Sequence, residues 1–526
     1  MTAEHPVAAV PRPPRSTDLP DGFTVQLAAD VHRSRNGRLL YGGSPPRLLR
    51  LNERTARLLD AGQFTASDPA TRAVARKLLD AGVVHPRPPA VRAHQTSIVI
   101  PVRDRADMLE RLLTALRSDA DTADLPVLVV DDGSRDPTRI AAAARRHGAR
   151  VLRHEHNLGP AVARNTGLRH SCTRFVAFID SDVVPCPGWL PTLLGHVLDP
   201  AVGLAAPRVV PLHRENRNWL DAFEETRSPL DMGPREGPVA PLTQLSYVPS
   251  TTIVVRREAV PWFAVDMRVG EDVDLCRRMH RAGWRLRYVP TARVAHEHRT
   301  DLLSWVGQRA FYGTSAAPLS LRHPGQVPPL HTAWWSSAAT ILLLNRRTAP
   351  LAVALTASAA VRLAKRMPDA DTPARAGALL ALGSLHATAQ QLARAATRHY
   401  WPLSAAAALT SRRARRLLAA AALVEGLLDH RNSSSPLPPL AHVLVRRLDD
   451  LAYGAGLWWG AIRNRTLAPL LPRIERVFRS RNHRRPPMEE PKCRNGSRQS
   501  PKPTGAPRNA CPKPSTKHSS RAANEA

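Results

Sequence analysis

A short apolar run that ends in two closely spaced acids constrains this chain more than any other stretch. Residues Phe175–Ile179 are all apolar and mostly aromatic or β-branched, which is typical of a strand buried on both faces. The run stops at Asp180-Ser181-Asp182. If the strand continued, its alternation would point the two carboxylates to the same side. Such a pair favours a divalent cation, and Mg²⁺ or Mn²⁺ accepts oxygen ligands.

An isolated pair of acids also occurs in turns that cap a helix, so the surrounding pattern decides between the two interpretations. Around this run the sequence alternates between strand and helix patterns. Strands are predicted at 97–101, 127–130, 151–152, 175–179, 248–255 and 286–289, and helices at 107–116, 140–149, from 160 and at 270–279. Repeated β-α-β units predict an α/β fold with a mostly parallel sheet, which binds its ligands at the carboxyl ends of the strands.

Polar loops follow these strand ends and suit a nucleotide-sugar site. Asp132 is placed to accept a hydrogen bond from a uracil N–H, and the helix that opens at Gly159 favours a diphosphate, with Arg164 one turn in. Asp180 and Asp182 then hold a metal ion that stabilises the departing diphosphate. No dinucleotide-binding or P-loop glycine pattern follows the first strand. The candidate donor-binding residues are Pro101, Arg103, Asp104, Asp131, Asp132, Gly159, Arg164, Asp180, Ser181 and Asp182.

Further acids and histidines follow downstream. Glu271 and Asp272 stand at the start of a predicted helix, where negative charge is also favoured by the helix dipole alone. The helix dipole explains one acid, but it explains the sequence Gly270-Glu271-Asp272 less well. His296 and His298 follow the last predicted strand. Lone histidines are often surface residues, but beside two carboxylates one of them, His296 by preference, is a candidate third metal ligand.

Five motifs in this order resemble the inverting family-2 glycosyltransferases of the GT-A fold, and the resemblance covers residues 96–315. The motifs are Ser97–Pro101, Val129–Ser134, Asn157–Asn165, Phe178–Asp182 and Gly270–Leu275. The resemblance implies that Asp132 binds uracil and that Asp180 and Asp182 bind the sugar nucleotide and the metal. It further implies that Asp272 is the general base, with Glu271 as the less preferred candidate. It also implies Mg²⁺ or Mn²⁺ as cofactor.

Two departures from the family pattern narrow the prediction. Arg103 stands where many members have tyrosine, so a guanidinium would stack on the base. The Q-x-x-R-W signature of processive polysaccharide synthases is absent, because Trp305 precedes Gln308 and Arg309 here. A cellulose-synthase-like enzyme is therefore disfavoured.

The N-terminal part is predicted to be a separate small unit at 22–85, between a disordered segment at 1–21 and a proline-rich linker at 86–89 that leads to the catalytic domain at 95–315. It reads as a hairpin around Arg35–Gly37 followed by helices at 55–59 and 71–80. This order resembles the winged-helix peptide-recognition domains of ribosomal-peptide modification systems. A purely structural extension is the alternative.

The C-terminal part divides into an Ala/Leu/Arg-rich helical region at 330–475 and a basic, disordered tail at 478–526. The helices are expected to pack on the catalytic domain, lie on a membrane surface, or insert marginally. Arginine clusters and the pairs Trp334-Trp335 and Trp458-Trp459 favour a membrane interface. We expect a peripheral or partly inserted protein on the cytoplasmic side of the inner membrane, with a cytoplasmic location as the alternative.

The net charge of +31 lies partly in the basic tail, and no nucleic-acid-binding motif accompanies it, so no specific nucleic-acid partner is expected. The order of the three parts resembles the glycosyltransferases of mycofactocin systems. This resemblance implies UDP-glucose as hexose donor and a peptide-derived redox cofactor precursor as acceptor, extended by β-linked glucose. The alternative is a family-2 enzyme of cell-wall or surface polysaccharide with a lipid-linked acceptor.

Overall fold

The computed structural model describes residues 10–475 except 15–17, 90, 94 and 216. The described part of the N-terminal segment expected to be disordered makes contacts: Leu19 is buried, and the carbonyl of Pro11 accepts a hydrogen bond from the Trp284 indole (2.6 Å). The basic tail predicted at 478–526 lies outside the described residues.

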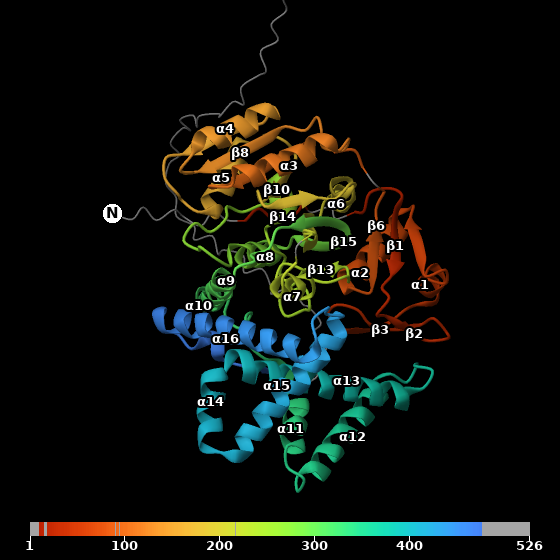
Figure 1. Ribbon diagram of the computed structural model, residues 1–526. Helices are drawn as coiled ribbons and strands as arrows, with labels where there is room; N and C mark the ends of the chain where they lie inside the picture. The colour runs from red at the N-terminus through yellow and green to blue at the C-terminus, as the bar shows by residue number, and fades with distance from the viewer. Residues whose placement is uncertain (1–9, 15–17, 90, 94, 216, 476–526) are drawn as a thin grey trace, which may run out of the picture. The chain divides into compact units, whose positions relative to one another are not determined.

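A nine-stranded sheet forms the centre of the catalytic domain (Figure 1). One half is parallel, in the order β10-β7-β8-β9. These strands are β7 (Thr96–Val102), β8 (Val127–Asp132), β9 (Arg150–His154) and β10 (Phe175–Ile179). All five residues of β10 are buried, as the apolar run predicted. This half confirms the α/β fold.

The other half of the sheet is mixed. The strand β14 (Thr252–Arg256) runs antiparallel to both β10 and β12 (Val202–Pro211), while β15 (Arg285–His296) runs parallel to β12. Two short strands, β11 (Val183–Pro185) and β13 (Gly237–Pro238), pair antiparallel with β15. The sheet is therefore less uniformly parallel than expected, because an apolar run such as that of β14 does not encode the direction of its partner.

Helices cover both faces of this sheet (Figure 1). One hydrophobic cluster joins the sheet to α3 (Ala106–Ser118), α4 (Pro137–Arg146) and α6 (Trp189–Val197). A second cluster, on the opposite face, contains residues of α5 (Pro160–His170) and α8 (Glu271–Ala282). The catalytic domain is thus a sheet between two helical layers, which leaves the strand ends for the site.

The N-terminal unit contains two small antiparallel sheets. Its elements are β1 (Phe23–Leu27), β2 (His32–Arg33), β3 (Leu39–Gly42), β4 (Arg47–Arg50), α1 (Glu53–Leu58), β5 (Gln63–Ala66), α2 (Pro69–Ala81) and β6 (Val84–Arg87). The stretch expected to begin the linker is the edge strand β6, where Pro86 is tolerated because β6 pairs only with β1. Arg76 binds Asp199 of the catalytic domain through two hydrogen bonds (2.8 and 2.6 Å).

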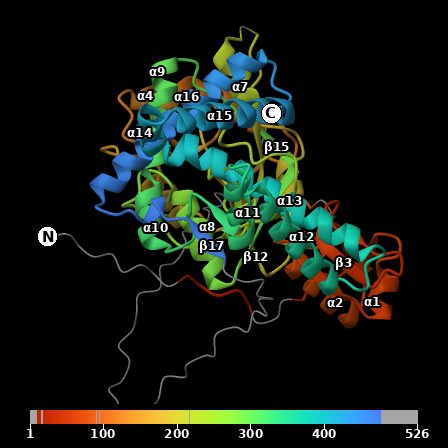
Figure 2. The same cartoon turned by 90° about the horizontal axis from the view of Figure 1, so that it is seen from below.

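The C-terminal region is helical. It consists of α11 (Trp334–Leu343), α12 (Ala349–Arg366), α13 (Pro373–Arg394), the π-helical turn Ala395–His399, α14 (Trp401–Thr410), α15 (Arg412–Ser433) and α16 (Pro439–Arg463). In both views the loop between α12 and α13 lies by β3 (Figures 1 and 2), where Met367 and Ala370 pack on Leu39. Among the described helices, none has the length and apolar character needed to cross a bilayer.

Buried ion pairs join α16 to the catalytic domain. Arg309, on α9 (Leu302–Thr314), lies between Glu224 of α7 (Trp219–Arg227) and Asp449 of α16, whose carboxylate is 3.0 Å from it. Arg398 also binds Asp449, at 2.7 Å. All these groups are largely buried, so each charge is stable there only when an opposite charge lies beside it. At least part of the helical region therefore packs on the catalytic domain, one of the three expected arrangements.

Glycines bring the backbones of α9 and α16 into direct contact. A Cβ atom at Gly456 would lie 1.8 Å from the Ala310 carbonyl oxygen, and one at Gly313 would lie 2.1 Å from the Tyr453 carbonyl oxygen. Neither neighbour can move without shifting a helix, because both are backbone atoms. Side chains larger than hydrogen are therefore excluded at this contact.

The variant Gly456→Ala is expected to lower the free energy of unfolding by about 1–3 kcal/mol, because α9 and α16 must separate. The matched control is Gly383→Ala on α13, where an added Cβ meets nothing within 4 Å. Both variants gain the helix preference of alanine, about 1 kcal/mol. Thermal unfolding by differential scanning calorimetry compares the two midpoints, and equal midpoints would contradict the close contact.

Candidate active site

The acids that end β10 lie in a turn, where the Val183 amide donates to the Asp180 carbonyl (3.2 Å). Because the strand stops at Ile179, its alternation does not govern the two carboxylates. Asp180 accepts a hydrogen bond from Arg164 (2.6 Å), whereas Asp182 accepts one from Arg105. Ser181, between them, is buried. The two acids thus have separate cationic partners.

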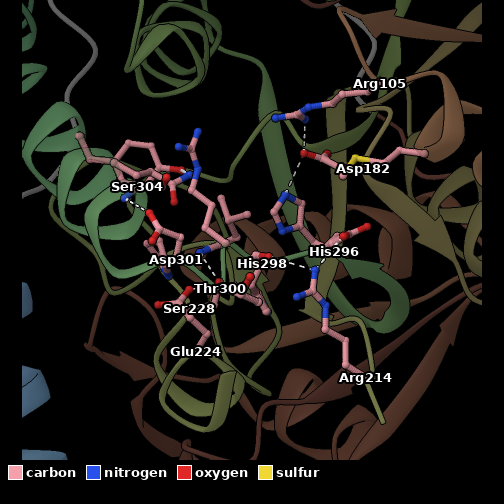
Figure 3. A pocket seen from close by; sticks show the side chains of 17 residues that line it. Arg105, Asp182, Arg214, Glu224, Ser228, His296, His298, Thr300, Asp301 and Ser304 are labelled. Carbon is pink, nitrogen blue, oxygen red and sulfur yellow. Dashed lines mark hydrogen bonds and ion pairs between the residues drawn. The ribbon is translucent and has the colours of Figure 1, made fainter. Parts of the chain in front are cut away.

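Asp182 faces a cavity of about 460 Å³ that also contains His296 (Figure 3). The antiparallel pairing of β11 with β15 places Val183 opposite His296, which brings the imidazole Nε2 to 3.5 Å from the Asp182 carboxylate. His298 lies instead 3.7 Å from Glu224. Of the two candidate histidines, His296 is therefore the one beside the strand-end acids.

Two polar atoms beside the cavity are available to bind a ligand. Asp182 Oδ1 and His296 Nδ1 are buried and have no hydrogen-bond partner among residues 10–475 as far as the structure describes them. Among the described residues no three His, Cys, Asp or Glu side chains form a ready-made metal site, and the other acid, Asp180, is held by Arg164. Mg²⁺ commonly takes one or two protein carboxylates and completes its shell with phosphates and water. Asp182 and His296 fit a metal ion shared in this way with a diphosphate.

The two acids at the end of β8, Asp131 and Asp132, accept hydrogen bonds from the loops around them. Asp132 accepts hydrogen bonds from the Leu158 and Gly159 amides (3.0 and 2.8 Å) and contacts His154 (2.8 Å). Asp131 accepts from the Ser134 amide (2.9 Å) and from Arg153 (2.5 Å). Both carboxylates therefore shape the loops beside α5, and the described structure places neither against the 460 Å³ cavity.

The loop after β7 lies next to the loop after β8. Asp104, with φ of 55°, accepts from the Arg135 amide (2.7 Å), and its own amide donates to the Ser134 hydroxyl (2.9 Å). Arg103 lies 3.6 Å from Asp104, and Pro101 pairs with Val130 in the sheet. The candidate donor-binding residues of these two loops thus meet at one sheet edge.

Arg164 connects the strand end to α8. Its guanidinium, with 3% of the side chain exposed, donates to Asp180 at 2.6 Å and to Glu271 at 3.1 Å. The diphosphate role predicted for Arg164 stays a prediction; in the structure the guanidinium holds two carboxylates. α5 begins at Pro160, after Gly159 with φ of 95°, so the turn that positions Arg164 needs glycine.

The two acids at the start of α8 have different surroundings. Glu271 is held by Arg164, whereas within the described chain Asp272 forms no ion pair and accepts only from the Val273 amide (2.7 Å). Burial raises the pKa of the Asp272 carboxyl to about 7, and the neighbouring Glu271 charge adds to the rise. A carboxylate with a pKa near neutrality suits proton abstraction. Asp272 is therefore the better candidate base of the two.

Several cavity residues were not predicted from the sequence. They come from α3, α7, α9 and the segments beside them: Arg105, Met108, Arg214, Glu224, Gln308 and Tyr312. Glu224 accepts from the Trp305 indole (2.8 Å) and from Arg309. The sequence singled out Trp305–Arg309 only as a motif in the wrong order, and nothing local connects it to an acid 81 residues away.

Comparisons with known proteins agree with this architecture. The profile of the family described as "Glycosyl transferase family 2" matches residues 97–260, which include β7, β10 and the turn at Asp180–Asp182. The fold and the acidic strand ends thus define the class of the catalytic domain, a glycosyltransferase.

The similarity to one relative extends over most of the chain. The "Pre-mycofactocin glycosyltransferase" of Mycobacterium tuberculosis is 46% identical over 476 residues, which cover 87% of this chain and 99% of the relative. The chain therefore belongs to the same family of glycosyltransferases as this protein. The "Succinoglycan biosynthesis protein ExoU" of Rhizobium meliloti is 26% identical over 39% of this chain and 63% of its own length. A mannosyltransferase from Pyrobaculum calidifontis, solved with GDP-Man and Mn²⁺, superposes with a TM-score of only 0.35 at 20% identity, covering 69% and 89% of the two chains.

The elevated pKa of Asp272 predicts the pH dependence of the enzyme. An acid with a raised pKa is protonated at a higher pH than usual, so kcat/KM is expected to fall tenfold per unit as the pH drops below about 7. Glu271→Gln removes the adjacent negative charge and is expected to move this limb to lower pH. Initial rates between about pH 5 and 9 measure both profiles; a wild-type rate that does not change below neutrality would contradict the role of Asp272.

Proposed function

We propose that this glycosyltransferase is a metal-dependent, inverting enzyme that transfers glucose from UDP-glucose to a peptide-derived acceptor, pre-mycofactocin, and builds a β-linked oligosaccharide. The choice of acceptor is supported by the similarity over 87% of the chain to the pre-mycofactocin glycosyltransferase of Mycobacterium tuberculosis. The donor and the β-linked glucose units are what the resemblance to mycofactocin-system glycosyltransferases implies, and the inverting mechanism is what the family-2 motifs imply. The chemistry is supported by Asp182, His296 and Asp272 around the strand ends.

The reaction is a single displacement. Asp272 accepts the proton of the acceptor hydroxyl, and the oxygen forms a bond to the anomeric carbon on the side opposite the diphosphate. The bond from that carbon to the diphosphate oxygen breaks, and its electron pair leaves with UDP. An α-linked donor thus gives a β-linked product. Base assistance of this kind contributes about 10²–10⁴-fold to the rate.

The residues near the diphosphate have distinct tasks in this proposal. Asp182 and His296 hold the metal ion, which when bound neutralises charge on the departing diphosphate. Arg164 fixes Asp180 and Glu271, so the strand end and the start of α8 keep a constant separation. Arg105, paired with Asp182, places a further cation at the cavity.

The division of labour between Asp182 and Asp272 can be tested with two variants. Asp182→Asn is expected to lose Mn²⁺-dependent binding of UDP-glucose, whereas Asp272→Asn is expected to bind both and to transfer no glucose. Isothermal titration measures binding of Mn²⁺ and UDP-glucose, and mass spectrometry measures glucosylated pre-mycofactocin. Glu258→Gln, with a side chain 68% exposed, is the matched control. Near-normal transfer by Asp272→Asn would contradict the mechanism.

We also propose that the protein associates peripherally with the cytoplasmic side of the inner membrane, through a tip formed by two loops of the C-terminal helical region. The loops α11–α12 and α14–α15 lie together at the bottom of Figure 1, joined by a hydrogen bond from Arg413 to the Leu344 carbonyl (2.9 Å). Leu344 and Leu409 are 52% and 82% exposed. The exposed arginines of this tip are Arg346, Arg347, Arg412, Arg413, Arg415 and Arg416. Apolar side chains ringed by arginines suit an anionic lipid surface.

The double variant Leu344→Glu/Leu409→Glu is expected to reduce binding to phosphatidylglycerol vesicles at least severalfold. Cosedimentation of the full chain measures it in about 0.5 M salt, which screens purely electrostatic adhesion. Val265→Glu is the control, since Val265 is 51% exposed on the catalytic domain. Equal binding of the double variant and the control would contradict the proposed tip.

A further inference from the structure

A second cavity continues from the first along α9. It measures about 350 Å³ and is lined by Arg299, Ser304, Gly307, Gln308, Phe311 and Tyr312. Four of these residues also line the 460 Å³ cavity, whereas Asp182 and His296 line only the larger one. The two cavities are therefore adjoining parts of one site, and the α9 cavity is the part away from the strand-end acids.

The last turn of α9, which lines this cavity, lies against the start of α8, although Asp272 itself is not among the residues that line either cavity. A Cβ atom at Gly270, the residue that caps α8, would lie 3.0 Å from Ser315 Cβ, directly after α9. The Ser315 hydroxyl in turn donates to the Tyr312 carbonyl (2.7 Å). The start of α8, which carries Asp272, thus abuts the last turn of α9, which carries Tyr312.

The hydroxyl of Tyr312 is prepared to donate a hydrogen bond. Gln308 Nε2 donates to it at 2.8 Å, so its own proton is available to another acceptor. Burial and the nearby Asp272 charge raise the pKa of Tyr312 to about 12, which keeps this proton in place at neutral pH. Tyr312 would donate this proton in a hydrogen bond to a substrate oxygen in the cavity. Tyr312 belongs to the last turn of α9, which lies against α8.

The remaining lining groups suit a ring with oxygen substituents. Phe311 lines the α9 cavity and is 44% exposed, so its ring is accessible to a ligand. Arg299 lines both cavities and, within the described chain, makes no hydrogen bond or ion pair, so its donors are available. Arg309 and the glycine contact with α16 fix α9, and the Phe311 ring is therefore presented from a rigid helix.

We propose that the α9 cavity is the acceptor subsite, and that it binds a ring-shaped hydroxyl compound whose flat face packs on Phe311 and whose reacting hydroxyl is oriented by Tyr312 towards Asp272. The proposal rests on the transferase function proposed above and adds the class of acceptor. A volume of about 350 Å³ lies within the usual range of small-molecule sites. The ring is either an aryl group or a pyranose, since both offer an apolar face to an aromatic side chain.

The first experiment measures initial rates of the full-length enzyme with pre-mycofactocin varied at saturating UDP-glucose, and the reverse. Phe311→Ala is expected to raise the KM for the acceptor about 3- to 10-fold, the loss typical of one aromatic contact, and to leave the KM for UDP-glucose within about twofold. Phe311→Tyr is expected to restore the acceptor KM. The matched control is Leu303→Ala, also on α9, 81% exposed and outside both cavity linings.

The result separates the two proposals. If the wild type transfers glucose but Phe311→Ala changes neither KM, or changes only that of UDP-glucose, the acceptor subsite is refuted while the transferase function stands. If the wild type makes no glucosylated product, the proposed function itself fails.

A second measurement identifies the ring. Saturation-transfer NMR of the enzyme with UDP and the diamagnetic ion Mg²⁺ uses 4-methylphenol as the aryl probe and cellobiose as the pyranose probe. Contact of either probe that is lost in Phe311→Ala and kept in Leu303→Ala supports the subsite and names its ring class. Contact that persists in Phe311→Ala, or no contact of either probe with the wild type, overturns it.

Discussion

The rest of the site depends on the two buried ion pairs of the Arg164 guanidinium. Arg164 lies in α5, with 3% of its side chain exposed, between Asp180 at the end of β10 and Glu271 at the start of α8. A buried cation is stable only with carboxylates around it, so the three elements are fixed relative to one another. This arrangement leaves Asp182 to the cavity and Asp272 without an ionic partner in the described chain. The same ion-pair cluster thus gives different surroundings to acids that are neighbours in the sequence.

A second buried network extends the site into the C-terminal region. Arg309 joins Glu224, at the cavity, to Asp449 of α16, and glycines let α16 touch α9 directly. The helices after residue 330 are therefore part of the structure that positions α9. The similarity to the relative from Mycobacterium tuberculosis likewise covers 87% of the chain, far beyond the residues matched by the family-2 profile. Both observations indicate that catalytic domain and helical region work as one enzyme.

Much of the fold was predictable from local patterns. The apolar runs of β7, β8 and β10 and the helix after Gly159 were predicted within a few residues, because burial on both faces demands continuous apolar sequence. No strand or helix was predicted for α7 or for the second half of β15, because the sequence there shows no comparable pattern. The direction of β14 was also beyond prediction, since an antiparallel neighbour has the same composition as a parallel one. The pairing of β11 with β15, which brings His296 to Asp182, depends on that sheet order.

The sequence by itself determined the family, the α/β fold and the acids at the strand ends, since these depend on residue type and short spacing. The tertiary structure alone decided what each acid does. Asp131 binds its own loop and Asp132 binds the loop before α5, whereas Asp180 pairs with Arg164 and Asp182 lies beside His296. The cavity along α9 is likewise a tertiary feature, built from residues distant in the chain. The reason is physical: composition specifies which groups are available, but burial and charge pairing depend on partners that only the folded chain brings together.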